Sequence, residues 1–224
     1  LSAVTQRAGR AARQQAGIAY RLWQEAGNGG LPPFDPPEIL ESDLAPLLLD
    51  CAHWGENDPT KLRWLDGPPA PALQQARKLL LSINALDASG HITPHGVQLA
   101  DLPLPPPLAH MVVEASKSGQ AEDAAMLALL LQERGLGGQG ENIETRFERF
   151  AGERSPKADA ARKLAQRISR MCRSGAGGQE PLSIGGLIAT AYPDRIAKRR
   201  DNKGEKWISA MGRGLQLDAA SLLA

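Results

Sequence analysis

The chain has 224 residues, 42% of them hydrophobic, which is enough to bury a core in one large domain or several small ones. It lacks both an apolar stretch of the roughly 20 residues that span a bilayer and a basic start followed by an apolar export signal. Cys51 and Cys172 lie far apart in helical patterns, which favours buried thiols over a disulfide or zinc site. We expect a cytoplasmic protein with no membrane partner and no metal.

The net charge of +1 conceals an uneven distribution along the chain. Residues 1–30 carry four basic and one acidic side chain, residues 31–142 carry six and fifteen, and residues 143–224 carry sixteen and nine. A basic final third joined to an acidic middle indicates that only part of the surface attracts a polyanion. Nucleic acid is the natural candidate.

The first 37 residues predict one helix, one strand and a linker. The stretch 5–15 is rich in Ala and Arg and is typical of a short helix that ends before Gly17. Residues 18–23 mix apolar, aromatic and β-branched side chains, which predicts a strand. The prolines and glycines of 28–37 indicate a linker and the first domain boundary.

Residues 38–107 predict two amphipathic helices followed by a small hairpin. Apolar residues recur at helical spacing in both helices, as Leu44, Leu47, Leu48 and Cys51 before Gly55, and as Leu73, Ala76, Leu80 and Ile83. Asp87 to Gly90 is a turn-forming sequence between two short extended segments. Helices followed by such a hairpin favour a winged helix.

Residues 108–178 predict a helical bundle. One apolar stripe predicts a helix that ends at Gly119, and residues 122–134 are apolar on most sides, as in a helix enclosed by others. Ser155 and Pro156 begin a third helix that runs to about Arg173. We expect its buried side to consist of Ala161, Leu164, Ile168 and Met171, and a separate basic side to consist of Lys163, Arg167 and Arg170.

The octet from Gln6 to Arg13, Gln-Arg-Ala-Gly-Arg-Ala-Ala-Arg, is the most informative stretch. On a helix, Gln6, Arg10 and Arg13 would project from one face. Guanidinium groups are permanently charged and forked, which suits the spread negative charge of a transferring phosphoryl group. The alternative is a surface helix whose arginines are only solvated.

The octet resembles motif VI of superfamily 2 helicases, Gln-Arg-x-Gly-Arg-x-Gly-Arg, in the form that DEAH-box RNA helicases carry. Later stretches resemble the winged-helix and ratchet regions of that family, and those around 191–197 and 212–214 are similar to its bacterial HrpB group. The resemblance implies a mainly α chain in four parts: the end of a RecA-like α/β domain (1–30), a winged helix (38–107), a helical ratchet bundle (108–178) and the start of a C-terminal β-containing region (179–224).

The resemblance also implies the roles of the motif residues. Gln6 would lie near the γ-phosphate and the attacking water, Gly9 would permit close packing, and Arg10 and Arg13 would act as arginine fingers. ATP and Mg²⁺ would serve the full-length enzyme, and this chain alone would bind neither, because it has no phosphate-cradling Gly-x-x-x-x-Gly-Lys-Ser/Thr loop and no Asp-Glu-Ala-His. The sequence departs from the family pattern at Ala12, where the family usually has glycine.

Two basic sets are candidates for contacts with RNA, expected to be single-stranded, with single-stranded DNA as an open alternative. They are the helical set Lys163, Arg167 and Arg170 and the run Lys198, Arg199 and Arg200. Both could instead be solvated faces. The missing RecA-like domains of the same protein would be the other partner.

A metal at His91 and His95 is not expected, because Thr93 and Pro94 separate them and no further ligand completes a site. The non-enzymatic alternative is a stand-alone nucleic-acid-binding or protein-docking winged-helix module. The second helix would offer Gln74, Gln75, Arg77 and Lys78 to duplex DNA, but its strongly acidic surroundings favour a structural hinge instead.

Overall fold

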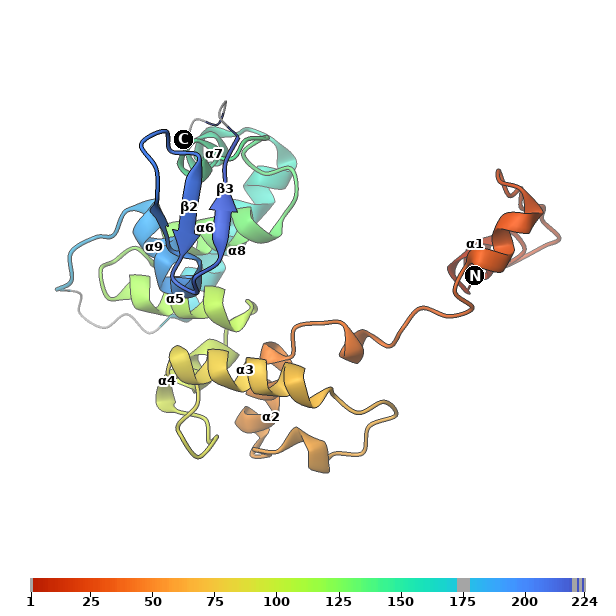
Figure 1. Ribbon diagram of the computed structural model, residues 1–224, viewed down its shortest axis with the longest axis horizontal. Coiled ribbons are helices and arrows are strands. Elements are labelled where there is room, and N and C mark those ends of the chain that lie inside the picture. The colour runs from red at the N-terminus through yellow and green to blue at the C-terminus, as the bar shows by residue number, and fades with distance from the viewer. Residues whose placement is uncertain (1, 173–177, 219–220, 222, 224) are drawn as a thin grey trace.

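The computed structural model describes residues 2–172, 178–218, 221 and 223 (Figure 1). Most of the structure is helical, and one small antiparallel sheet follows near the C-terminus, so the mainly α prediction is confirmed. The α-helices are α1 (Ser2–Ala11), α2 (Ala45–Trp54), α3 (Ala70–Ser82), α4 (Pro94–Ala100), α5 (Pro106–Ser116), α6 (Ala121–Gln132), α7 (Ile143–Gly152), α8 (Pro156–Met171) and α9 (Ile184–Ala191). The strands are β1 (Ala197–Arg199), β2 (Lys206–Ser209) and β3 (Gly214–Gln216), and short 3-10 turns occupy Glu25–Gly30, Glu38–Leu40, Pro59–Lys61 and Pro193–Arg195.

The N-terminal segment, residues 2–36, lies apart from the body of the structure (Figure 1). Helix α1 ends at Ala11, four residues before the expected end. The strand predicted at 18–23 is wrong for this chain, because residues 16–22 have no regular secondary structure. A strand forms when its backbone pairs with a neighbouring strand, and within the described residues nothing pairs there.

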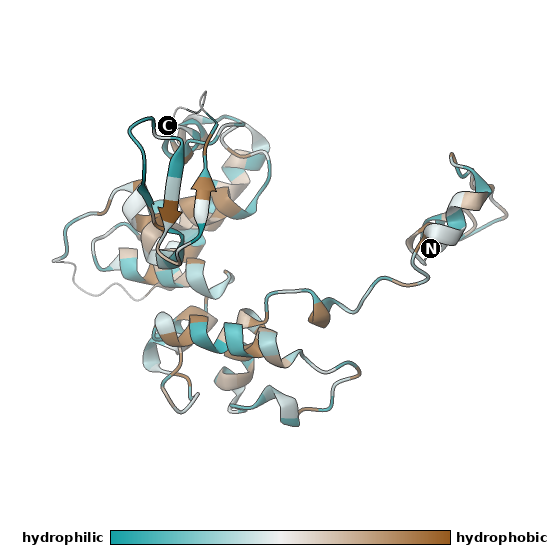
Figure 2. Ribbon diagram, viewed as in Figure 1, coloured by the Kyte–Doolittle hydropathy of each residue, from teal (hydrophilic) through white to brown (hydrophobic). Residues whose placement is uncertain are grey.

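Helices α2, α3 and α4 form the first half of the body, and both predicted helical stripes are confirmed. Leu48 and Leu80 are almost fully buried, and Gly55 ends α2 in the left-handed conformation at φ 99°. In Figure 2 α3 carries both hydrophilic and hydrophobic residues, as expected of a helix with one buried side. The hairpin is reduced to one bridge, between Leu86 and Ile92, so this half has the helices of a winged helix and a minimal wing.

Helix α4 begins at Thr93 and Pro94, the two residues that separate His91 from His95. The Thr93 hydroxyl accepts a hydrogen bond from the Gly96 amide at 2.9 Å, and Pro94 occupies the first helical position. A Cβ at Gly96 would lie 2.1 Å from the Ala85 carbonyl oxygen. The absence of a side chain at Gly96 therefore lets α4 pack directly on the chain that follows α3.

The second half of the body is a bundle built around α6. Seven consecutive residues of α6, from Ala124 to Leu130, are buried, and α5, α7 and α8 all contact it. Helix α7, for which the sequence supplied no prediction, buries Phe150 completely and is capped by the Asn142 side chain. The prediction of an enclosed helix is confirmed for α6, which ends at Gln132, two residues before the predicted end.

Helix α8 begins at Ser155 and Pro156 as predicted, but its buried side is partly wrong. Ala158, Ala165 and Ile168 are buried, whereas Leu164 and Met171 are 41% and 49% exposed. Helices α6 and α8 are in contact. The small side chains of Ala158 and Ala165 allow the two helix backbones to approach each other. The predicted end at Arg173 and the glycine-rich stretch 174–177 lie outside the described residues.

The three strands form an antiparallel sheet in the order β1-β2-β3, which agrees with the predicted β-containing end. Ala197 pairs with Ser209, and Trp207 pairs with Leu215. One hydrophobic core runs from Leu44 in the first half to Ala191 in α9. Among the described residues, no helix has both the length and the apolar character that crossing a bilayer requires.

Replacing Gly96 by Ala should destabilise the body by roughly 1–3 kcal/mol, because the new methyl group meets the Ala85 carbonyl. Gly152→Ala is the matched control, since a Cβ there meets nothing within 4 Å. Urea unfolding of both variants measures the difference. Equal stability of Gly96→Ala and the unsubstituted chain would show that the contact between α4 and Ala85 is not close.

Candidate functional site

The motif VI-like octet starts on an exposed helix and ends beyond it. Gln6 and Arg10 lie one turn apart on α1 and are exposed, so their side chains share a face as expected. Arg13 follows the end of the helix at Ala11, so its predicted helical alignment with Arg10 is wrong. The octet therefore presents one helical amide–guanidinium pair and a second arginine on the adjoining turn.

The chain after α1 folds back on its end. A Cβ at Gly17 would lie 2.0 Å from the Ala11 carbonyl oxygen, so a larger residue would push this return path away. The start of α1 is held to the linker, because the Ser2 amide donates to the Pro33 carbonyl at 3.1 Å and the Ser2 hydroxyl to Asp35 at 3.3 Å. Gly9 has open space around it, so any close packing there involves a partner outside residues 2–172 and 178–218.

The N-terminal segment exposes its large apolar side chains. None of residues 2–36 is buried, and Leu22 is 94% exposed. Ile18, Tyr20 and Phe34 are each more than three-quarters exposed. A segment with this much apolar surface and no core of its own is typical of a surface that meets another protein surface.

The basic set of α8 is solvent-exposed, as predicted. Lys163, Arg167 and Arg170 project from the helix, and Leu164 and Met171 are exposed beside them. This face therefore combines cations with apolar surface. Either component suits nucleic acid, since cations contact phosphates and apolar side chains contact bases or sugars.

Arg162, on the same helix, has a structural role. Its guanidinium donates to the carbonyls of Phe150 and Glu153, both at 2.7 Å, and pairs with Asp159. These bonds join α8 to the end of α7. Among the basic residues of α8, Arg162 is thus already engaged within the bundle.

The basic run 198–200 divides between the two faces of its sheet. Successive strand residues point to opposite faces, so Lys198 and Arg199 diverge. Arg199 faces Trp207 across the pair, and the Arg200 amide donates to the Lys206 carbonyl at 2.8 Å. All three basic residues are exposed, but they do not form one patch of three.

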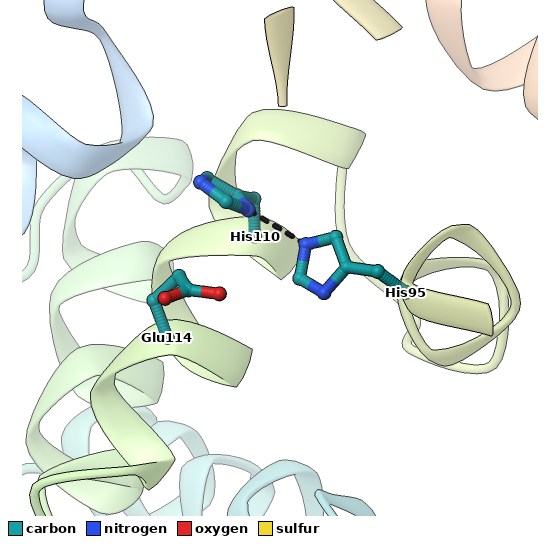
Figure 3. A group of neighbouring side chains, drawn as sticks. All are labelled: His95, His110 and Glu114. Atoms are coloured by element: carbon teal, nitrogen blue, oxygen red, sulfur yellow. Dashed lines mark hydrogen bonds between the residues drawn. The ribbon is translucent and has the colours of Figure 1, made fainter. Parts of the chain in front are cut away.

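A histidine pair that the sequence analysis did not consider lies where α4 meets α5. The Nε2 atom of His95 is 2.8 Å from Nδ1 of His110, and the rings meet edge to face (Figure 3). His91 instead lies near Asp87 on the surface. The signal in the sequence was the spacing of four residues between His110 and Glu114 within a predicted helix, which places both on one face.

Burial dominates the protonation of this pair. It lowers the pKa of His110 to about 4, with a smaller contribution from neighbouring His95, while Glu114 opposes the shift. Burial likewise lowers the pKa of His95. Both rings are therefore neutral near pH 7, and the nitrogen lone pair of one ring accepts the hydrogen bond from the other.

Comparison with known proteins identifies the family. Residues 76–104 match the winged-helix part of the helicase-associated domain HA2. The whole chain is 33% identical over 223 residues to the ATP-dependent RNA helicase HrpB of Escherichia coli, covering 26% of its length. A crystal structure of E. coli DEAH/RHA helicase HrpB superposes with a TM-score of 0.77 and 32% identity over 99% of this chain. The chain corresponds to a C-terminal part of a HrpB-type DEAH-box helicase.

Other ATP-dependent RNA helicases match a smaller share of the chain. The probable ATP-dependent RNA helicase DHX35 of Homo sapiens is 33% identical over 132 residues, 58% of this chain and 19% of its own length. This chain thus spans about a quarter of HrpB and less of DHX35. The HA2 match begins in α3 and ends just before α5, within the predicted winged helix 38–107. The bounds of the four predicted parts stay predictions.

Proposed function

We propose that the full-length protein is an ATP-dependent RNA helicase and that this chain supplies its nucleotide-sensing arginines and part of its RNA-binding surface. The observation that carries the proposal is the 33% identity to HrpB along the entire chain, together with a motif VI-like octet that begins on an exposed helix. The octet contributes cations and an amide. The phosphate-cradling loop and the ligands of Mg²⁺ belong to the rest of the enzyme, because no such sequences occur among these 224 residues.

In this proposal Arg10 and Arg13 stabilise the charge that develops on the γ-phosphate, and Gln6 orients the attacking water. The exposed position of Gln6 and Arg10 on α1 leaves them accessible to a nucleotide held by another domain. The turn that carries Arg13 lets the second guanidinium approach from a different direction. Ala12 adds only a methyl group on an exposed surface, so it leaves this approach open.

The N-terminal segment would complete a RecA-like domain with the preceding polypeptide. Residues 18–23 have strand composition and lack a strand partner here, so they would join that domain's sheet and bury Ile18, Tyr20 and Leu22. This arrangement connects the arginines to the winged helix through the linker 28–37. The RecA-like domains, which form the motor of the enzyme, would close around ATP. The linker would then transmit this movement to the body.

Single-stranded RNA would contact the exposed cations of α8 and the sheet. Lys163, Arg167 and Arg170 lie along one helix and could follow a phosphate backbone, with Leu164 and Met171 beside them. A duplex-reading winged helix is less well supported, because Arg77 donates from Nη2 to the Asn57 carbonyl at 3.0 Å and is half-buried. The surrounding acidic segment also repels a polyanion.

Arg10→Ala in the full-length protein should lower RNA-stimulated ATP turnover by about 10³-fold while RNA binding is retained, because one charge-stabilising group is lost from the transition state. Phosphate release at saturating RNA measures this, and Arg63→Ala, an exposed arginine in a loop of the body, is the control. Full turnover in Arg10→Ala would reduce the octet to a structural helix and favour a non-enzymatic winged-helix module.

Replacing Lys163, Arg167 and Arg170 together by Ala should weaken single-stranded RNA binding and reduce the slope of log affinity against log salt by about 2, since each lost phosphate contact contributes about 0.7. Fluorescence anisotropy over a range of salt concentrations measures both. A Lys61→Ala, Arg63→Ala variant is the charge control. An unchanged slope would show that the α8 face is solvated and does not contact RNA. The same titration of a Lys198→Ala, Arg199→Ala, Arg200→Ala variant tests the sheet independently.

A further inference from the structure

Three side chains converge at the contact between α4 and α5. His95 comes from the first turn of α4, and His110 and Glu114 lie one turn apart on α5 (Figure 3). One ligand-type atom from each of the three lies within 4.8 Å of the others. All three side chains are half-buried, so their positions are fixed by the packing of the two helices.

This donor set matches a known coordination chemistry. Two neutral imidazoles and a carboxylate are ligands of Zn²⁺ and similar divalent ions, and three protein ligands leave a fourth position for water. Zinc–nitrogen bonds of about 2.0–2.1 Å in a tetrahedron place the two nitrogens roughly 3.3 Å apart. The present 2.8 Å separation of His95 Nε2 and His110 Nδ1 therefore needs to open by only about half an ångström.

We propose that His95, His110 and Glu114 bind one divalent transition-metal ion of the zinc class. The two imidazoles share a hydrogen bond in this structure, and ion binding would replace that bond. The proposal departs from the expectation that the chain holds no metal, which considered His95 only together with His91. The partners that complete the set, His110 and Glu114, come from the next helix.

The site would join two parts of the chain that are separate in sequence but meet in space. The HA2 match ends at residue 104, before α5 begins at Pro106, so His95 lies within the winged-helix match and the other two ligands lie beyond it. An ion bound to both would cross-link α4 to α5 at this junction. Metal binding should therefore stabilise the chain as well as saturate the site.

The ammonium group of Lys117 would weaken binding of the ion, because it already pairs with the Glu114 carboxylate. Its Nζ atom lies 2.6 and 2.7 Å from the two carboxylate oxygens of Glu114, and the side chains form an ion pair on one helix. A bound cation would compete with this ammonium group for the same carboxylate. Removing the charge at residue 117 should strengthen metal binding, an effect that a structural ion pair alone does not produce.

The test is a Co²⁺ titration of the purified chain, monitored by visible absorption and followed by displacement with Zn²⁺. One equivalent should bind with the absorption of a low-coordinate His-ligated site, and zinc should raise the melting temperature by several degrees. His110→Gln and Glu114→Gln should each weaken binding at least about tenfold. Lys117→Gln should bind more tightly than the unsubstituted chain.

His91→Gln and His53→Gln are matched controls, because both histidines are exposed and lie outside the three-residue set. Each should retain the full stoichiometry and affinity. Circular dichroism without metal establishes that every variant is folded. The proposal is overturned if no ion binds below millimolar concentration, if His110→Gln and Glu114→Gln bind as tightly as the unsubstituted chain, or if either control abolishes binding.

Discussion

The enclosure of α6 is the constraint on which the body of this structure depends. A helix with seven consecutive buried residues exposes almost no face, so α5, α7 and α8 must surround it. That requirement turns Lys163, Arg167 and Arg170 of α8 outward, since the small residues Ala158 and Ala165 face α6. It also fixes α5, from which His110 reaches His95.

The N-terminal segment, unlike α6, has no buried residues. It carries strand-forming and aromatic residues but buries none of them among the described residues, and it connects to the body through a proline-rich linker. The candidate nucleotide-sensing arginines thus lie on the part of the chain with the least internal support. In the proposed enzyme their position would come from the motor domain that the segment completes, and the body would follow the motor through the linker.

The sequence predicted helices where several apolar residues repeat within one chain segment, as for Leu44 to Cys51 and Leu73 to Ile83, but it gave no prediction for α7. It failed where structure depends on a partner: residues 18–23 need a neighbouring strand, and the buried side of α8 is selected by close contact with α6. The His95–His110 contact joins residues on two helices, which periodicity within one helix does not reveal. The octet could be recognised from its residues. The sequence did not predict that α1 ends before Arg13.

Hydrogen–deuterium exchange of the backbone amides of residues 18–23 tests most directly whether the N-terminal segment completes a motor domain. The account predicts rapid exchange in the 224-residue chain and strong protection in the full-length protein, because pairing with a sheet removes those amides from solvent. Exchange that is equally rapid in both would contradict it, since the segment would then remain unpaired and the candidate arginines of the octet would have no motor domain to position them.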